Sequence, residues 1–214
     1  MTVKIKVYSD FICPFCFLGT GPLDEVVKEK DVEVEWMPFE LRPSPSPKID
    51  PRTQPRVMEA WNSFIYPTAK KLGLEIKLPH FRSYTHFAFE GYQFAKEHGK
   101  GNEFHHRVFI AHFQEEQNIE DIEVLTKLAE EVGLSQDALK EALVSRKYRE
   151  MHREAIKHAH VEAQIMAVPT FIIGNEVIQG FTSKEKLAKA IDQEIEKNKE
   201  NELDRLQCSI DGDC

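Results

Sequence analysis

Two cysteines near the beginning of the chain have the spacing of a reactive thiol pair. Cys13 and Cys16 lie in the stretch "SDFICPFCFLG" and are separated by Pro14 and Phe15. Proline suits the first turn of a helix, where its missing N–H leaves no hydrogen bond unmade. The unpaired N–H groups at a helix N-terminus favour negative charge, so a cysteine placed there ionises more easily. The sequence therefore predicts that Cys13 is an attacking thiol and that Cys16, about one turn further on, is a resolving thiol.

A metal site and a structural disulfide are the alternatives for this pair. A zinc site usually needs four ligands, and the remaining cysteines, Cys208 and Cys214, stand at the far end of the chain. The spacing of His158 and His160 would point them apart on a helix. A disulfide that closes so small a ring would add little stability. We therefore expect no metal, and a redox couple is the favoured interpretation.

The pattern around the cysteines predicts a β-α-β unit. Residues 3–9 alternate, with Val3, Ile5 and Val7 on one face, which is typical of a strand. Helical spacing continues from the cysteines to about residue 30, and residues 31–41 alternate again. Such a beginning favours two parallel strands joined by a right-handed crossover.

The rest of the chain predicts a helical insertion followed by a return to the sheet. Residues 42–55 contain five prolines and read as a linker. Helical patterns then fill residues 56–163, and "VPTFIIGNEVIQG" (168–180) predicts a hairpin that turns at Gly174-Asn175. A last helix follows, with capping-box spacing at Thr182 and Glu185. The predicted fold class is α/β. One domain spans residues 1–204, with a core of 1–45 and about 164–200 around the insertion 56–163, and a polar cysteine-containing tail at 205–214.

Composition limits the partners and the location. The net charge is −8 and no basic cluster occurs, so nucleic-acid binding is not expected. The beginning of the chain lacks the apolar core of a signal peptide, and no stretch approaches the roughly 20 apolar residues of a membrane helix. We therefore expect a cytoplasmic protein without membrane contact. In that compartment thiols are kept reduced, and a close cysteine pair is more often catalytic or metal-binding than structural.

A second feature is the stretch "MAVPTF", in which Pro169 precedes a predicted strand. Proline is tolerated as the first residue of a strand, and this is the simpler interpretation. A cis Val168–Pro169 bond would instead expose backbone beside the active sulfurs, where an extended substrate peptide could pair. Only the combination with the upstream cysteine pair supports the second interpretation, and the sequence does not decide between the two isomers. Val168, Pro169 and Thr170 are candidate substrate contacts together with Pro14 and Phe15.

Four stretches together resemble the DsbA-like branch of the thioredoxin superfamily, and more closely its FrnE-type subgroup. They are "SDFICPFCFLG", "VEVEWMPFELRP", "EVLTKLAEEVGL" and "AVPTFIIGNEVIQG", and the resemblance covers roughly residues 2–200. It implies a thioredoxin fold with an all-helical insertion, a redox disulfide at Cys13 and Cys16, and a cis-proline at Pro169. The implied activity is thiol–disulfide exchange with disulfide-containing proteins or small molecules.

The resemblance also bears on direction and on cofactors. DsbA carries a histidine before its second cysteine, whereas Phe15 stands here, so we expect a couple less oxidising than the about −120 mV of DsbA. That favours reductase or isomerase work. No resident cofactor is implied, and glutathione is a candidate reductant. The alternative is a glutathione-dependent kappa-class transferase or 2-hydroxychromene-2-carboxylate isomerase, although these usually place serine at the position of Cys13.

Several other residues have two interpretations. Glu33 and Glu35 could supply a buried acid beneath the cysteines, but strand alternation favours solvent for both. His105 and His106 are expected at the surface or at a rim. Cys208 and Cys214 could form a second redox pair, or could be incidental thiols in a disordered tail, and the sequence does not decide between these. The aromatic residues of the insertion are expected mainly in the core, although they could line a groove: Phe87, Phe89, Tyr92, Phe94, Phe104, Phe109 and Phe113.

Overall fold

The sheet has four strands in the order β2-β1-β3-β4. β1 (Val3–Ser9) and β2 (Val32–Pro38) are parallel, and β3 (Thr170–Ile173) runs antiparallel to β1. β4 (Glu176–Gln179) completes the β3–β4 hairpin. This is a computed structural model, which describes the backbone of residues 2–211 and the side chains of residues 2–202. The predicted parallel pair and the predicted hairpin are both confirmed.

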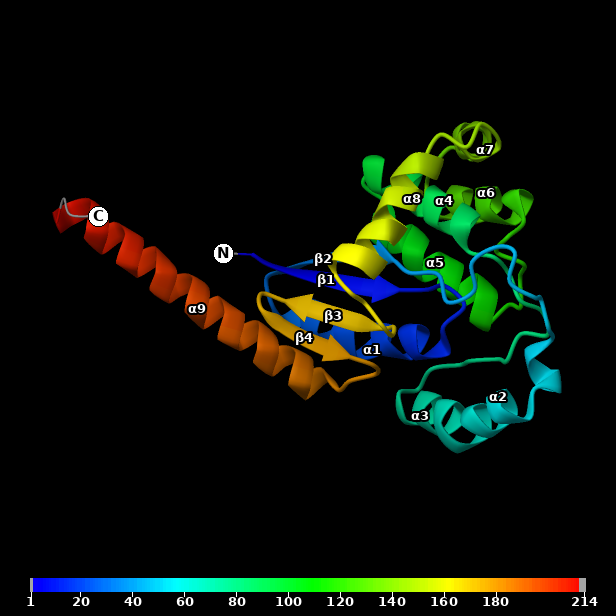
Figure 1. Cartoon of the computed structure of the whole chain (residues 1–214), viewed down its shortest axis with the longest axis horizontal. Helices are drawn as coiled ribbons and strands as arrows, with labels where there is room; N and C mark the ends of the chain where they lie inside the picture. The colour runs from blue at the N-terminus through cyan, green and yellow to red at the C-terminus, as the bar shows by residue number, and fades with distance from the viewer. Residues whose placement is uncertain (1, 212–214) are drawn as a thin grey trace.

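The helix α1 (Pro14–Glu29) crosses from β1 to β2 and packs one face of the sheet (Figure 1). α9 (Lys184–Asp211) packs against α1 and then extends well past the strands. Its cap differs from the prediction by one residue, because Ser183, not Thr182, accepts from the backbone N–H of Lys186 at 3.4 Å. α9 also continues through most of the predicted tail at residues 205–214. The stretch from Lys184 contains no glycine or proline before Gly212, so nothing in the sequence ends the helix earlier.

The long insertion is helical, as predicted. It follows a coil with one short turn, η1 (Pro51–Thr53). α2 (Pro55–Ala60) and α3 (Tyr66–Lys71) are joined by the π-turn η2 (Trp61–Ile65). Pro67 explains this interruption, because it lacks the N–H that a continuous α-helix would need there. The remaining elements are α4 (His86–Glu97), α5 (Gly101–Phe113), α6 (Ile122–Glu131), α7 (Gln136–Val144), α8 (Arg149–Lys157) and the π-turn η3 (His158–Glu162).

Aromatic side chains join the insertion to the sheet layer. Phe11, which follows β1, lies 4.8 Å from Phe89 of α4 and 5.4 Å from Phe109 of α5 between ring centroids. Phe17 of α1 stacks on Phe113 at 5.3 Å. The predicted core role of the insertion aromatics is therefore confirmed for Phe89, Tyr92, Phe94, Phe104, Phe109 and Phe113, while Phe87 is half-buried.

An ion pair inside the insertion connects α4 to the end of α7. The Glu90 side chain is fully buried. Its carboxylate accepts one hydrogen bond from Nη2 of Arg146 at 2.6 Å and one from Nε of Arg146 at 3.1 Å. Arg146 lies just beyond α7 with a positive φ of 57°. Removing one partner of a buried pair leaves the other charge without compensation, which is more costly than the net gain from the pair itself.

Arg146→Met should therefore lower the free energy of unfolding by about 2 kcal/mol, the scale of a buried polar group left unsatisfied. Methionine keeps the apolar stem, so the loss reports the missing charge and hydrogen bonds. Urea unfolding measures the change. The matched control is Arg153→Met, because the Arg153–Glu150 pair is exposed at both ends. The control should change stability by less than about 0.5 kcal/mol, and an equal loss in both variants would contradict the assigned role of Arg146.

Candidate active site

Cys13 is the N-cap residue of α1, with Pro14 at the first helical position. Its N–H donates to the carbonyl of Asp10 at 3.0 Å, and its own carbonyl accepts from Cys16 and Phe17 at 3.1 and 3.2 Å. The sulfur makes no capping bond to the helix and points instead to the backbone oxygen of Val168, 3.6 Å away. The negative charge of a thiolate at this place would be stabilised by the helix N-terminus.

Cys16 lies behind Cys13 and is equally buried, with 3% of its surface exposed. Both are free thiols. Burial raises the pKa of Cys16 well above its usual range, and the adjacent Cys13 raises it further. The backbone N–H of Asp10 and the hydroxyl of Ser9 act in the opposite direction. The two sulfurs therefore differ in their surroundings: Cys16 holds its proton firmly in a closed environment, and Cys13 faces the loop before β3.

Asp10 is a buried acidic residue beside the cysteine turn that the sequence reasoning missed. It follows β1 directly and is completely buried. Its carboxyl oxygens accept from the backbone N–H of Leu41 at 2.7 Å and from that of Ile12 at 3.4 Å. Burial raises the pKa of Asp10 to about 7, despite the bonds to Leu41 and Thr85 that lower it. Because the carbonyl of Asp10 also holds the Cys13 N–H, this residue fixes the turn that presents the cysteines.

The loop before β3 forms the other side of the site. The Val168–Pro169 peptide bond is cis, as the family resemblance implies. Val168 is 8% exposed, and its carbonyl is the one that meets the Cys13 sulfur. Thr170 is the first residue of β3, and its hydroxyl donates to the carbonyl of Ala167 at 2.7 Å. The structure therefore places Val168 against Cys13, with the predicted contact residues Pro169 and Thr170 next to it in the chain.

The other two predicted contact residues lie on the outer side of the cysteine turn. Pro14 and Phe15 are both half-buried, and the Phe15 ring lies 5.4 Å from that of Phe64 in η2.

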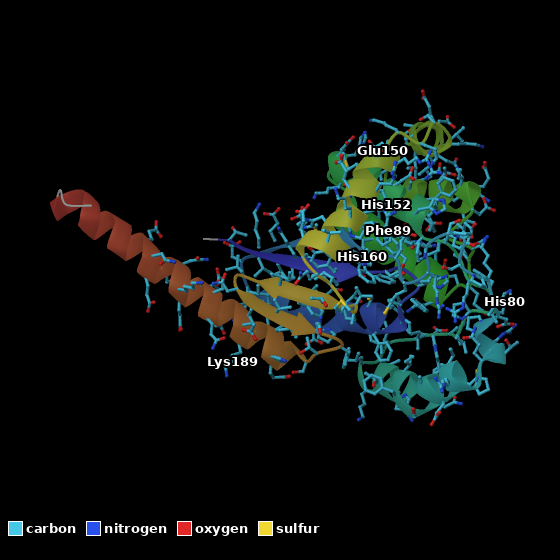
Figure 2. The ribbon with its side chains drawn as sticks, viewed as in Figure 1. His80, Phe89, Glu150, His152, His160 and Lys189 are labelled. Atoms are coloured by element: carbon cyan, nitrogen blue, oxygen red, sulfur yellow. The ribbon has the colours of Figure 1, made fainter. Side chains whose placement is uncertain are left out.

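A further polar pair is buried between β2 and α8, where a carboxylate oxygen of Glu40, which follows β2, lies 2.5 Å from Nε2 of His152. His152 projects from α8 and stacks on Phe89 of α4 (Figure 2). The negative charge of Glu40 contributes to the raised pKa of Asp10.

Glu33 and Glu35 stand apart from the cysteines, as the strand alternation predicts. Glu33 pairs with Lys4 at 3.5 Å and Glu35 with Lys96 at 2.7 Å.

The expectation that His105 lies at the surface or at a rim was wrong, because this side chain is 1% exposed. It stacks on Trp36 at 3.7 Å between centroids, so aromatic packing takes the imidazole out of water. Burial lowers its pKa well below the usual range. His106 is half-buried at the surface and contacts Asp24.

Three further predictions concern a metal site, the second cysteine pair and the membrane. Among the described side chains, no group of three or more His, Cys, Asp or Glu residues is arranged to hold a metal ion. Cys214 lies outside the described residues, as does the side chain of Cys208, so the second redox pair stays a prediction. Within the helices that the structure describes, none is both long and apolar enough to cross a membrane.

The fold and the cysteine turn define a class of protein. The model of the DSBA-like thioredoxin domain matches residues 4–192, and the chain belongs to this family. A relative is YwbO of Bacillus subtilis strain 168, which is 57% identical over 199 residues and is matched along 100% of its length and 92% of this chain. The Cys208–Cys214 segment lies beyond the residues that the family model matches.

Solved structures share the fold at low identity. A probable DsbA oxidoreductase from Streptomyces coelicolor superimposes with a TM-score of 0.77, 21% identity, and coverage of 90% of this chain and 89% of that one. The cytosolic disulfide reductase DsbM from Pseudomonas aeruginosa, in a structure with GSH, superimposes with a TM-score of 0.65, 15% identity, and coverage of 93% and 99%. The thioredoxin-like architecture with a helical insertion is therefore confirmed.

Proposed function

We propose that this protein is a thiol–disulfide oxidoreductase of the reductase or isomerase type, with Cys13 as nucleophile and Cys16 as resolving thiol. One observation carries the proposal: the Cys13 sulfur lies at the mouth of α1, 3.6 Å from the Val168 carbonyl, with the buried Cys16 behind it. A structural cysteine would not need a helix N-terminus.

The proposed reaction has two exchanges. The Cys13 thiolate attacks one sulfur of the substrate disulfide, a Cys13–substrate bond forms, and the other substrate sulfur leaves as a thiolate that takes up a proton. Cys16 then loses its proton and attacks the Cys13 sulfur, which releases the second substrate thiol and leaves a Cys13–Cys16 disulfide. The substrate gains two electrons and the protein dithiol loses two. A thiol reductant, for which glutathione is a candidate, would restore the dithiol.

The environments of the two sulfurs support this division of roles. Because burial raises the pKa of Cys16, this thiol stays protonated and does not compete for the incoming disulfide. Val168, Pro169 and Thr170 lie where a substrate chain could dock beside Cys13, and Pro14 and Phe15 form the outer border. We propose disulfide-containing proteins or small molecules as substrates.

The reducing direction and a cytoplasmic location belong to the same proposal. Phe15 stands where a histidine could otherwise stabilise the Cys13 thiolate, and this favours a less oxidising couple. A cytosolic disulfide reductase shares the fold, which is compatible with such a role. Equilibrating the Cys13/Cys16 pair with glutathione measures its potential: a value near −270 mV would indicate a reductase, and one near −120 mV an oxidant.

Trapping of a mixed disulfide tests the proposed roles directly. Cys16→Ser should accumulate a covalent adduct between Cys13 and a disulfide substrate, because the thiol that resolves it is missing. Mass spectrometry of the unreduced protein detects the adduct, and reductant should remove it. Cys13→Ser is the control and should trap nothing. If Cys16→Ser instead turns over fully with glutathione, the two-cysteine mechanism is wrong, and the glutathione-dependent isomerase or transferase becomes the better interpretation.

A further inference from the structure

A hollow of about 390 Å³ opens beside the cysteine turn, between the beginning of α1 and the helical insertion. Ile12, Pro14 and Phe15, which flank Cys13 in the sequence, form one side of it. The opposite side comes from α2 and η2, which lie across from the beginning of α1 (Figure 1). Its volume is in the range of small-molecule sites. A molecule held there would lie next to the proposed nucleophile.

The body of this pocket is apolar and partly aromatic. Trp61 and Ile65 of η2 are buried and face it, as does Phe113 at the end of α5. The Trp61 and Phe113 ring centroids are 6.2 Å apart. Phe81, in the loop before α4, also lines the pocket. Such walls favour an aromatic or aliphatic group, which gains free energy when it leaves water.

Three arginines line the same pocket, and no acidic residue does so among the described residues. Arg42, Arg56 and Arg82 come from three separate segments. Arg82 donates only to neutral groups, the carbonyl of Ile49 at 3.0 Å and the amide oxygen of Gln54 at 3.5 Å. No ion pair to Arg42 or Arg56 is formed within residues 2–202. By contrast, four other arginines pair with carboxylates: Arg52, Arg107, Arg146 and Arg153.

The charges around Arg82 indicate that Arg42 is close to it. Burial lowers the pKa of Arg82, and the positive charge of Arg42 lowers it further. Two guanidinium groups that repel each other, without an intervening carboxylate, favour an anion between them. This concentration of positive charge is notable in a chain whose net charge is −8.

His112 supplies a second, independent polar group. It is 2% exposed, it lines the pocket, and its Nδ1 atom has no hydrogen-bond partner among the described residues. Burial lowers the pKa of His112 to about 4, so the ring is neutral near pH 7. A buried polar atom without a partner is costly, and a ligand or a water molecule would relieve that cost.

We propose that this pocket selects the disulfides of small amphipathic anions, in which an apolar, preferably aromatic, body carries a carboxylate. The inference rests on the proposed function and names its substrate class. The apolar body lies against Trp61 and Phe113, and the carboxylate is bound by the arginines. The disulfide bond then lies toward Cys13. In this exchange the protein dithiol and one disulfide give the protein disulfide and two thiols.

A single-turnover comparison of two aromatic disulfides tests this selection. The reduced protein is mixed with 5,5′-dithiobis(2-nitrobenzoate), which carries carboxylates, or with bis(4-nitrophenyl) disulfide, which does not. The released thiolate is followed by absorbance, so no reductant is needed. The measured quantity is the second-order rate constant for the carboxylate-bearing probe divided by that for the uncharged probe. Dividing this ratio by the same ratio for a free dithiol corrects for the intrinsic reactivity of the probes. We expect this normalised ratio to exceed unity by about tenfold, the lower range of electrostatic steering, and to fall as salt rises.

Variants assign the selection to the arginines. We expect the normalised ratio to fall close to unity in the double variant Arg42→Gln/Arg56→Gln. The triple variant, which adds Arg82→Gln, should give the same result. The double variant keeps the test valid if Arg82, which holds the carbonyl of Ile49, is needed for folding. Arg52→Gln is the matched control, because this arginine is bonded to Asp50 and does not line the pocket. The control should keep the wild-type ratio.

The outcomes separate the two proposals. If the wild-type protein discriminates between the two probes no better than a free dithiol does, anion selection is wrong while thiol–disulfide exchange stands. The same conclusion follows if the arginine variants keep the wild-type ratio. If wild type reacts with neither probe faster than Cys13→Ser does, the proposed function itself fails, and the substrate class fails with it.

Discussion

Cys13→Ser is expected to reduce disulfide turnover to the background of the assay, a loss of about a thousandfold or more. The serine hydroxyl is a far weaker nucleophile than a thiolate, and Cys16, whose pKa is raised well above its usual range by burial, stays protonated and does not replace it. Turnover of a small disulfide with a thiol reductant measures the loss. Because Cys13 caps α1 without a side-chain hydrogen bond, the variant should unfold at nearly the wild-type temperature.

The second cysteine pair provides the comparison for this result. If Cys208→Ser/Cys214→Ser keeps wild-type turnover, these thiols take no part in the reaction. A loss comparable to that of Cys13→Ser would instead identify a second redox pair. Substantial turnover by Cys13→Ser itself would contradict the assignment of the nucleophile.

Asp10→Asn is expected to remove a large pH dependence of stability. The pKa of Asp10 is raised from 3.8 to about 7 in the folded protein, so between these values the folded state holds a proton that the unfolded state has lost. Stability from this group is complete below pH 4 and falls as the pH rises toward 7. This difference in pKa between the folded and unfolded states corresponds to about 4 kcal/mol of stability. Asparagine stays neutral and can still accept from Leu41.

Urea unfolding of wild type and Asp10→Asn between pH 4 and pH 8 measures this effect. The free energy of unfolding of the variant, minus that of wild type, should rise by several kcal/mol across the range, because all other groups cancel in the difference. Asp137→Asn, at an exposed position on α7, is the control and should give a nearly flat difference. A flat difference for Asp10→Asn would show that its carboxyl titrates normally.

The strands and the cysteine turn could be predicted because their signals are local. Alternation at Val3, Ile5 and Val7, a proline after Cys13 and a glycine-containing turn at Gly174 each act over a few residues. The helix N-terminus at Cys13 follows from the proline alone. The family resemblance added the cis bond at Pro169, which no local pattern requires.

Asp10 was missed because its environment is not local. An aspartate after a strand is common in turns, where it is exposed. Here its main partner is the N–H of Leu41, 31 residues further along the chain. The same cause explains His105, whose burial depends on the distant Trp36. The arginines of the pocket converge from a linker, a helix and a loop, and no periodicity predicts that convergence.

The hydrogen bond between the Cys13 sulfur and the Val168 carbonyl spans 155 positions of the chain. A ribosome adds roughly 5–20 residues per second, so about 8–30 s separate the synthesis of the two residues. For that interval Cys13 and Cys16 exist without the loop that covers them. The newly made pair is open to adventitious oxidation or to partners, and it acquires its protected setting only after Val168 has been synthesised.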